Sequence, residues 1–289
     1  MLNVIKMDLY RMIKTKSFYV ILMIIVVFML FGSYMIDQDL STLKEMAKDA
    51  ELQTDQAAGN GADTDKNVNL GISFDATPLM QDNITLLDEA SVMLSSAILL
   101  FFTGIFAVLF VCGENSTGFI KNIISCTKKR RYVILSKTVV MSIFVVLETI
   151  ILLIALSIGS SIFHSSVSMK LSLSFRFLQY VGLQCLLHIA FAIIIIMISV
   201  IVRSTAISMM ISIGLSSGLG SLIISYLSML KIGSFHVGEN LVKYFVTTNV
   251  QALTSQFTKD MGIRVLMVSL AAILLYNIIS CVVMDKRDI

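Results

Sequence analysis

The sequence of 289 residues has no tryptophan, a single proline and few charges, which make up 14% of its residues. Soluble domains carry about 25% charged residues and about 45–50% apolar ones, whereas 56% of this chain is hydrophobic. The composition therefore excludes a soluble globular protein, a disordered chain and a collagen-like fibre. The four cysteines stand singly, at positions 112, 126, 185 and 281, and their spacing predicts neither a disulfide framework nor a metal site.

Six long apolar runs account for this composition. Each is about 20 residues long, which at ~1.5 Å of rise per residue is enough to cross a hydrocarbon core of ~30 Å. The sequence therefore predicts an all-α, polytopic membrane protein. The six expected transmembrane helices lie at about residues 17–36, 91–112, 138–162, 176–202, 206–230 and 261–283.

The distribution of lysine and arginine predicts the side of the membrane on which each loop lies. Six spans place both termini on one side, and 13 of the 22 basic residues fall on that side, within short segments. Because short cytoplasmic loops are enriched in positive charge, both termini are predicted to be cytoplasmic. The outer side then holds residues 37–90 and 231–260.

The outer segment 37–90 is polar and acidic, with twelve acidic residues and three lysines. Its stretch LSTLKEMAKDAEL predicts a short helix. Two interpretations remain open for the segment: a solvated loop without a ligand, and an outer lid or docking element for a partner.

Residues 1–16 have an amphipathic pattern. Leu2, Ile5, Leu9, Met12 and Ile13 recur at helical spacing, and basic residues lie on other faces. This pattern predicts an interfacial helix on the cytoplasmic side that leads into the first span. A simple basic anchor for the topology fits the same residues.

The segment CGENSTGFIKNIISCTKKRRYVILSK, residues 112–137, follows the second span. Glu114 comes directly after the apolar run, and a capping Ser116 or Thr117 precedes a second amphipathic pattern. This pattern predicts a short cytoplasmic helix with an apolar face formed by Phe119, Ile120, Ile123 and Ile124. Basic residues follow it and are predicted to contact anionic lipid headgroups, at about 1 kcal/mol each: Lys128, Lys129, Arg130 and Arg131.

The same segment copies the glycine spacing of a phosphate-binding loop, from Gly113 to Gly118. Such a loop requires Lys and then Ser or Thr after the second glycine, whereas Phe119 and Ile120 stand there. The sequence therefore predicts no ATP hydrolysis by this chain and no catalytic residues.

The chain resembles the permease subunits of type-2 ATP-binding-cassette (ABC-2) exporters, particularly small bacterial members associated with the export of, or immunity to, antimicrobial peptides such as lantibiotics. The resemblance covers nearly the full length. It rests on the lead-in ending in KTKSFYV, the E-x-x-x-G-x-I-K-N segment with its R-x-x-x-x-S-K continuation, the six spans and the terminal MDKRDI. The long acidic outer segment departs from the family pattern and leaves the substrate open.

The resemblance implies a coupling element and a set of partners. Glu114 and the helix at 118–125 would rest on a separate ABC ATPase subunit, through Gly118, Phe119, Ile120, Lys121, Ile123 and Ile124. ATP and Mg would be bound by that subunit, and this chain would bind no cofactor directly. A second permease subunit, identical or different, would complete the pathway in the bacterial plasma membrane, and no nucleic acid is expected.

The resemblance also implies that part of the outer segment 231–260 forms a re-entrant helix at the outer end of the pathway, with Leu241, Phe245 and Val246 on one face. From the coupling role we expect Glu114→Ala and Ile120→Asp to uncouple ATP hydrolysis from transport without unfolding the protein.

Polar residues inside the expected spans form a second group of candidates. Glu148 and His188 lie at similar depths in spans three and four, so the two side chains are expected to pair. An ionised acid at a helix centre costs about 2.5–3.5 kcal/mol, which favours a structural hydrogen bond, although a place in the substrate path or a proton relay stays open. Gly214 and Gly218 have the G-x-x-x-G spacing that permits close helix packing.

Two other classes of function remain as alternatives. An ion-coupled secondary transporter would use Glu148 and His188 as proton carriers, although no internal repeat supports that class. A membrane protein for immunity or sensing, without transport, also fits the sequence. An intramembrane metallohydrolase is disfavoured because there is no H-E-x-x-H motif.

Overall fold

The computed structural model describes residues 1–53, 86–116, 118, 130–163, 175–220, 222 and 244–286. Every regular element in these ranges is an α-helix, so the predicted all-α class is confirmed. The helices are α1 (Leu2–Lys14), α2 (Lys16–Gln53), α3 (Leu86–Ser95), α4 (Ala97–Ser116), α6 (Arg131–Phe163), α7 (Phe175–Val202), α8 (Thr205–Ser216), α11 (Val246–Ala252) and α12 (Lys259–Asp285).

Five helical segments in the described ranges are long and apolar enough to cross a membrane. They correspond to the first, second, third, fourth and sixth expected spans, and they are Lys16–Met35, Ala97–Glu114, Arg131–Phe163, Phe175–Val202 and Lys259–Asp285. The fifth expected span, 206–230, begins as α8, which has 12 residues. Ser217 and Gly218 then form a turn, and residues 223–243 lie outside the described residues, so six spans stays a prediction.

Two expected elements have different limits in the structure. The second span is interrupted at Ser96, which separates α3 from α4. The stretch LSTLKEMAKDAEL does not form a separate short helix, because α2 runs without interruption from Lys16 to Gln53. The expected loop 37–90 therefore begins as a continuation of the first span.

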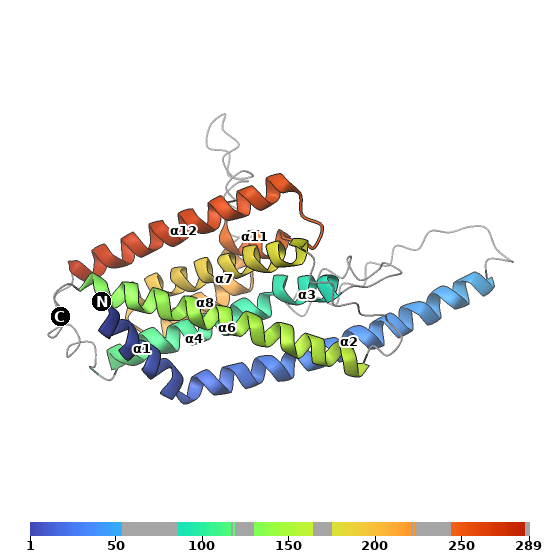
Figure 1. The fold of residues 1–289 in the computed structure, drawn as a ribbon, viewed down its shortest axis with the longest axis horizontal. Coiled ribbons are helices and arrows are strands. Elements are labelled where there is room, and N and C mark those ends of the chain that lie inside the picture. Colours follow the sequence, from blue (N-terminus) through green and yellow to red (C-terminus); the bar gives the residue numbers. More distant parts are fainter. Residues whose placement is uncertain are drawn as a thin grey trace.

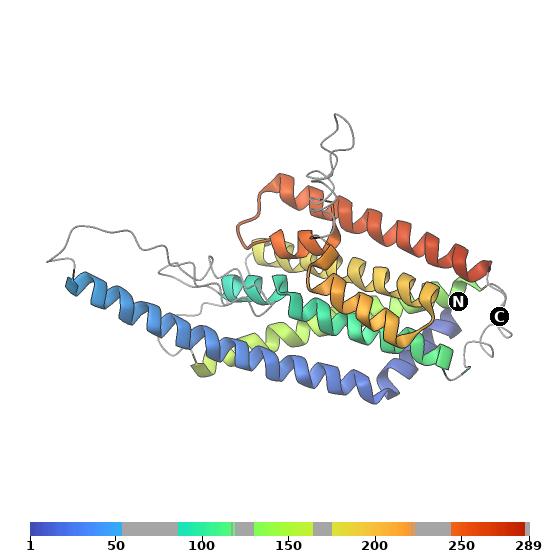
Figure 2. The ribbon, with the colours of Figure 1, turned by 180° about the vertical axis from the view of Figure 1, so that it is seen from behind.

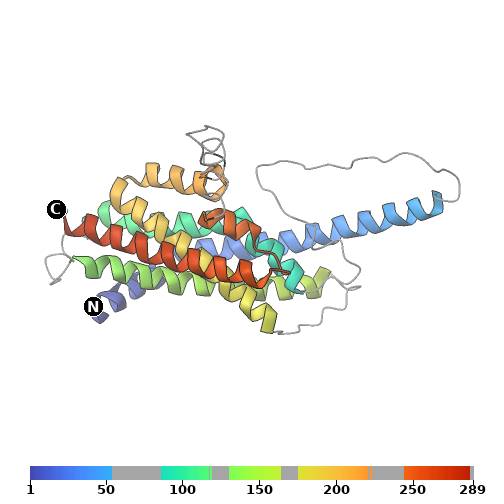
Figure 3. The same ribbon diagram turned by 90° about the horizontal axis from the view of Figure 1, so that it is seen from above.

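The long helices lie side by side and define two ends of the bundle (Figure 1). The first residues of α1 and the last residues of α12 are at the same end, which we call the terminal end. α3 and the beginning of α12 are at the opposite end, which we call the distal end, and α2 projects beyond the other helices there (Figures 1 and 3). The common position of the termini agrees with an even number of crossings, whereas the cytoplasmic assignment of this end stays a prediction.

Burial along the spans distinguishes the centre of the bundle from its rim. In α4 67% of the spanning window is buried, whereas only 28% is buried in α2 and in α12. α4 therefore lies at the centre, and α2 and α12 present apolar side chains such as Met23, Phe31, Leu274 and Ile278 outward, where lipid would contact them.

One close helix approach in the described part of the chain involves Gly104, which is not one of the two expected glycines. α8 lies beside α4 (Figure 2) and buries a stripe of Ser208, Ser212 and Ser216. A Cβ atom on Gly104 of α4 would collide with Ser212 Oγ, so the small residue is required there. Gly218 instead has φ +84° in the turn after α8, which is a conformation that suits glycine. In the described residues the close approach is therefore between Gly104 and Ser212, whereas a Cβ atom on Gly214 would meet Leu219 at an ordinary contact distance.

Candidate functional site

α1 is a buried structural element and not only a surface anchor. Asp8 and Met12, one turn apart on the same face, are 0% and 1% exposed. Leu2 and Ile13, which belong to the predicted apolar face of this interfacial helix, are exposed. α1 ends at Thr15, whose backbone is extended and whose hydroxyl donates a 2.7 Å hydrogen bond to the carbonyl of Arg11. The bend at Thr15 between α1 and α2 orients the polar side of α1 toward α4 and α6.

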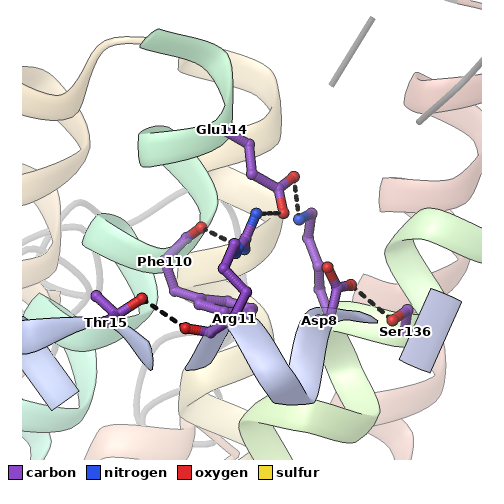
Figure 4. A network of polar contacts seen from close by, with 7 residues as sticks. Asp8, Arg11, Thr15, Phe110, Glu114 and Ser136 are labelled. Atoms are coloured by element: carbon purple, nitrogen blue, oxygen red, sulfur yellow. Dashed lines mark hydrogen bonds and ion pairs between the residues drawn. The ribbon is translucent and has the colours of Figure 1, made fainter. Parts of the chain in front are cut away.

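Glu114 is the centre of a buried ionic network at the terminal end (Figure 4). Its side chain is 1% exposed and forms ion pairs with Arg11 of α1 and Lys137 of α6. Arg11 also donates from Nη2 to the carbonyl oxygen of Phe110, at 3.1 Å. One carboxylate therefore joins three helices that are distant in the sequence.

Asp8 adds a second carboxylate to the network. Its Oδ2 accepts a 2.6 Å hydrogen bond from Ser136 Oγ of α6, and its charge acts on both Arg11 and Lys137. Burial lowers the pKa of Arg11, and the neighbouring Asp8 carboxylate opposes that change. The four groups comprise two charges of each sign, so the burial of each ion is compensated by opposite charge. We call Asp8, Arg11, Glu114 and Lys137 the charge network.

The two cations of the charge network pack against the ring of Phe110. Arg11 Cζ is 4.3 Å and Lys137 Nζ is 5.5 Å from the ring centroid of Phe110. Phe110 stacks on Phe106, which stacks in turn on Phe144 of α6 with 3.9 Å between ring centroids. The ring face attracts each cation and excludes water from one side of the ion pairs.

The structure describes four of the predicted coupling and lipid-contact residues: Glu114, Gly118, Arg130 and Arg131. Glu114 is in the last turn of α4, and Gly118 follows with φ +69°. Arg130 is half-buried in the turn before α6, and Arg131 is exposed at the first position of α6. The other members lie outside the described residues: Phe119, Ile120, Lys121, Ile123, Ile124, Lys128 and Lys129.

The structure changes the expectation for Glu114 and adds residues that the sequence analysis missed. Because Glu114 is buried between two cations, its substitution by Ala is expected to destabilise the protein, whereas the sequence analysis expected uncoupling without unfolding. Arg11 was counted only as a topology signal, Lys137 only as a topology signal and as part of the R-x-x-x-x-S-K pattern, and Asp8 was not considered. An acidic residue within the apolar pattern of residues 1–16, three positions before an arginine, is the signal that could have indicated the network.

Glu148 and His188 do not bind each other in the structure. Glu148 Oε2 lies 2.8 Å from Thr103 Oγ1 of α4, and His188 Nδ1 lies 2.8 Å from the carbonyl oxygen of Gln184 in its own helix. Both side chains are 1% exposed, and neither Glu148 Oε1 nor His188 Nε2 has a hydrogen-bond partner among the described residues. The expected pair is therefore replaced by contacts of Glu148 with α4 and of His188 with its own backbone.

A second polar network lies in the distal half and consists of neutral groups. Gln184 Nε2 of α7 donates to the carbonyl oxygens of Leu94 and Val250, at 2.8 and 3.1 Å. Tyr180 Oη donates to the carbonyl oxygens of Ser91 and Leu253, at 3.2 and 3.3 Å. The carbonyls of Leu94, Val250 and Leu253 lie in the last turn of α3 or in the last turn and at the C-cap of α11, where helices leave backbone acceptors unpaired, and Ser91 lies one turn earlier in α3. α7 therefore caps the ends of α3 and α11, and we call Tyr180 and Gln184 the capping pair.

The helices and their apolar outer faces define a multi-pass membrane protein. Residues 70–217 match the model of the family described as ABC-2 family transporter protein, which covers half of the chain. The chain belongs to this family and is therefore of the ABC-2 permease type, a membrane subunit that is not itself catalytic. No curated protein matches the chain.

Proposed function

We propose that the chain is the permease subunit of an ABC exporter that receives mechanical work from a separate ATPase at the terminal end. Family membership supports the general class. In this proposal two permease subunits frame the pathway, each ATPase subunit binds the segment 118–125, and the terminal end is cytoplasmic. The proposed cargo is an amphipathic peptide, lipid or drug that is exported or cleared from a bacterial plasma membrane, antimicrobial peptides included.

The observation that carries the proposal is the position of Glu114 immediately before the expected coupling segment. A force on residues 118–125 reaches the end of α4 directly, and α6 begins at Arg131, on the other side of the same segment. The charge network ties these two helix ends to α1 through Arg11 and Lys137. The three helices are therefore expected to move as one body when the segment is displaced.

This linkage assigns distinct tasks to the two parts of the coupling region. Phe119, Ile120, Ile123 and Ile124 would bind the ATPase, because an apolar helix face gives a docking surface. Glu114 would hold the moving helices together and would not contact the ATPase, because it is buried by α1 and α6. Loss of the apolar helix face would weaken binding of the ATPase. Loss of Glu114 would instead lower the stability of the permease.

The test is purification of the tagged full chain from membranes of its native host in a mild detergent, with mass analysis of the accompanying proteins. An ABC ATPase is expected to accompany the unmodified chain. Ile120→Asp is expected to lower its recovery about tenfold, because a charge would replace an apolar contact. The matched control is Asn122→Asp, which adds the same charge at the neighbouring polar position and is expected to leave recovery close to that of the unmodified chain.

The comparison is valid only if both variants reach the membrane in equal amounts, which is measured on the same samples. Absence of any ABC ATPase from the unmodified sample, or equal recovery with both variants, would contradict the proposal.

A further inference from the structure

A pocket of about 510 Å³ lies between α7, α8, α12 and the beginning of α11. This volume is within the range of ligand sites in proteins, about 300–1,000 Å³. Its walls are mainly apolar and include Phe191 of α7, Leu215 of α8 and Met267 of α12. The pocket shares no residue with the charge network or with the capping pair, so neither of them accounts for it.

Two polar groups in the pocket wall lack partners among the described residues. Thr247 is 2% exposed, and its Oγ1 has no hydrogen-bond partner there. The buried Nε of Arg264 also has none. Buried polar atoms are nearly always hydrogen-bonded in proteins. A guanidinium nitrogen and a hydroxyl without partners, in a mainly apolar wall that also includes Tyr244 and Tyr276, therefore suit a ligand with an anionic group and an apolar body.

The dimensions of the pocket match one leaflet of a bilayer. Arg264 is five residues from the beginning of α12, so it lies about 7 Å along the axis from the distal end of that helix. Tyr276, which also lines the pocket, is twelve residues further, or about 18 Å deeper. Half of a hydrocarbon core of ~30 Å is about 15 Å. The pocket thus extends from a cation near the distal surface to about the depth that an acyl chain reaches.

The pocket wall includes apolar side chains that are exposed on the outer surface of the bundle. Met267 and Leu275 are 61% and 53% exposed and line the pocket from α12. Because exposed apolar side chains of a spanning helix face lipid, a lipid would enter between these residues without crossing water.

From these observations we propose that the pocket binds one acyl chain of an anionic phospholipid, with the phosphate held by Arg264 and Thr247. On the predicted topology this lipid belongs to the outer leaflet. A zwitterionic lipid would lack the net charge that a single arginine attracts, and a soluble phosphate would leave the apolar wall unoccupied. The inference concerns lipid binding alone and does not depend on the ATPase-coupling proposal.

The absence of tryptophan allows a direct test, because one introduced tryptophan is a unique fluorophore. The full chain with Tyr276→Trp reports on the pocket. The chain with Leu274→Trp is the matched control, because Leu274 is 64% exposed at a similar depth on α12 and does not line the pocket. Each variant is reconstituted in phosphatidylcholine vesicles with a minor fraction of phosphatidylglycerol that carries bromine atoms, which quench tryptophan, on its acyl chains.

We expect brominated phosphatidylglycerol to be enriched about fivefold at the Tyr276→Trp position over its share of the bilayer, and not enriched at the Leu274→Trp position. Adding Arg264→Gln should remove the enrichment, adding Arg264→Lys should retain most of it, and adding Thr247→Val should reduce it. Brominated phosphatidylcholine should quench the Leu274→Trp variant and the variant that also carries Arg264→Gln in proportion to its share, and should quench Tyr276→Trp less than its share, because phosphatidylglycerol displaces it there.

Three results would overturn the inference. One is equal enrichment at the two tryptophan positions, and another is enrichment that survives Arg264→Gln. The third is a Tyr276→Trp signal that neither lipid quenches, because protein, either another segment of this chain or a second copy, would then fill the pocket.

Discussion

The two polar networks of the bundle satisfy different needs. The charge network at the terminal end joins the side chains of three helices through ions. The capping pair in the distal half uses an amide and a phenol, and all four of its bonds go to backbone carbonyls. The charge network consists of ion pairs between side chains. The capping pair instead donates hydrogen bonds to backbone carbonyls of neighbouring helices.

The difference follows from the cost of burial. Neutral donors can be placed deep in a bundle at modest cost when each bond goes to an acceptor that would otherwise be unpaired. Buried ions need opposite charges around them, and their loss is costly because the remaining ions are left uncompensated. When the terminal end moves, the ions of the charge network therefore have to stay together, whereas the capping pair needs no charged group.

The largest expected effect is that of Glu114→Gln. This change leaves Arg11 and Lys137 without their shared carboxylate and should lower the free energy of unfolding by about 3–5 kcal/mol. Thermal unfolding in detergent, followed by reaction of a thiol-specific dye with buried Cys112, measures the effect. Asp260→Asn is the control, because Asp260 is exposed in the first turn of α12 and its helix-dipole contribution is about 0.3–1 kcal/mol. Equal shifts for the two variants would remove the distinction between the networks.

A medium effect is expected from Gln184→Leu. The carbonyls of Leu94 and Val250 lose their donor, at a cost of about 1–3 kcal/mol. Tyr180→Phe removes only the hydroxyl from the other member of the capping pair and should cost about 1 kcal/mol, since its two bonds are longer. The same unfolding assay ranks the two variants. A larger loss for Tyr180→Phe than for Gln184→Leu would contradict the assigned roles.

The smallest effect is expected from Glu148→Gln. Glu148 has no ion-pair partner in the described part of the chain and contacts Thr103, a bond that the amide oxygen of Gln can also accept. The change should therefore alter the free energy of unfolding by less than about 1 kcal/mol, far below the effect of the same substitution at Glu114. A large loss here would indicate a compensating charge near Glu148. In an ion-coupled transporter, transport driven by a pH gradient would be lost with the protein still stable.

Much of the fold follows from the sequence because the length and hydropathy of a run are local properties. Five of the six expected runs coincide with helices long enough to span, and the amphipathic pattern at the N-terminus is helical. The break at Ser96 was not expected, because the donor that pairs the carbonyl of Leu94 beside it is Gln184, about ninety residues away in the chain. Hydropathy carries no information about such distant partners.

The candidate site was predicted in part. Glu114 was chosen from its position after an apolar run and from the family resemblance, but its partners come from residues 11 and 137, which sequence patterning treats as independent loop charges. The expected Glu148 and His188 pair was based on equal depth alone. Depth does not specify which face of each helix carries the side chain, and Glu148 contacts α4.

α2 extends well beyond its membrane-spanning part, and on the predicted topology this extension lies outside the cell. The helix continues for eighteen residues after its spanning part ends at Met35, which corresponds to about 27 Å of rise. On the predicted topology this extension is the first part of the acidic segment 37–90 and would place Gln53 about 27 Å beyond the end of the span. The acidic residues between Met35 and Gln53 would then attract a cationic peptide before the peptide reaches the bilayer surface.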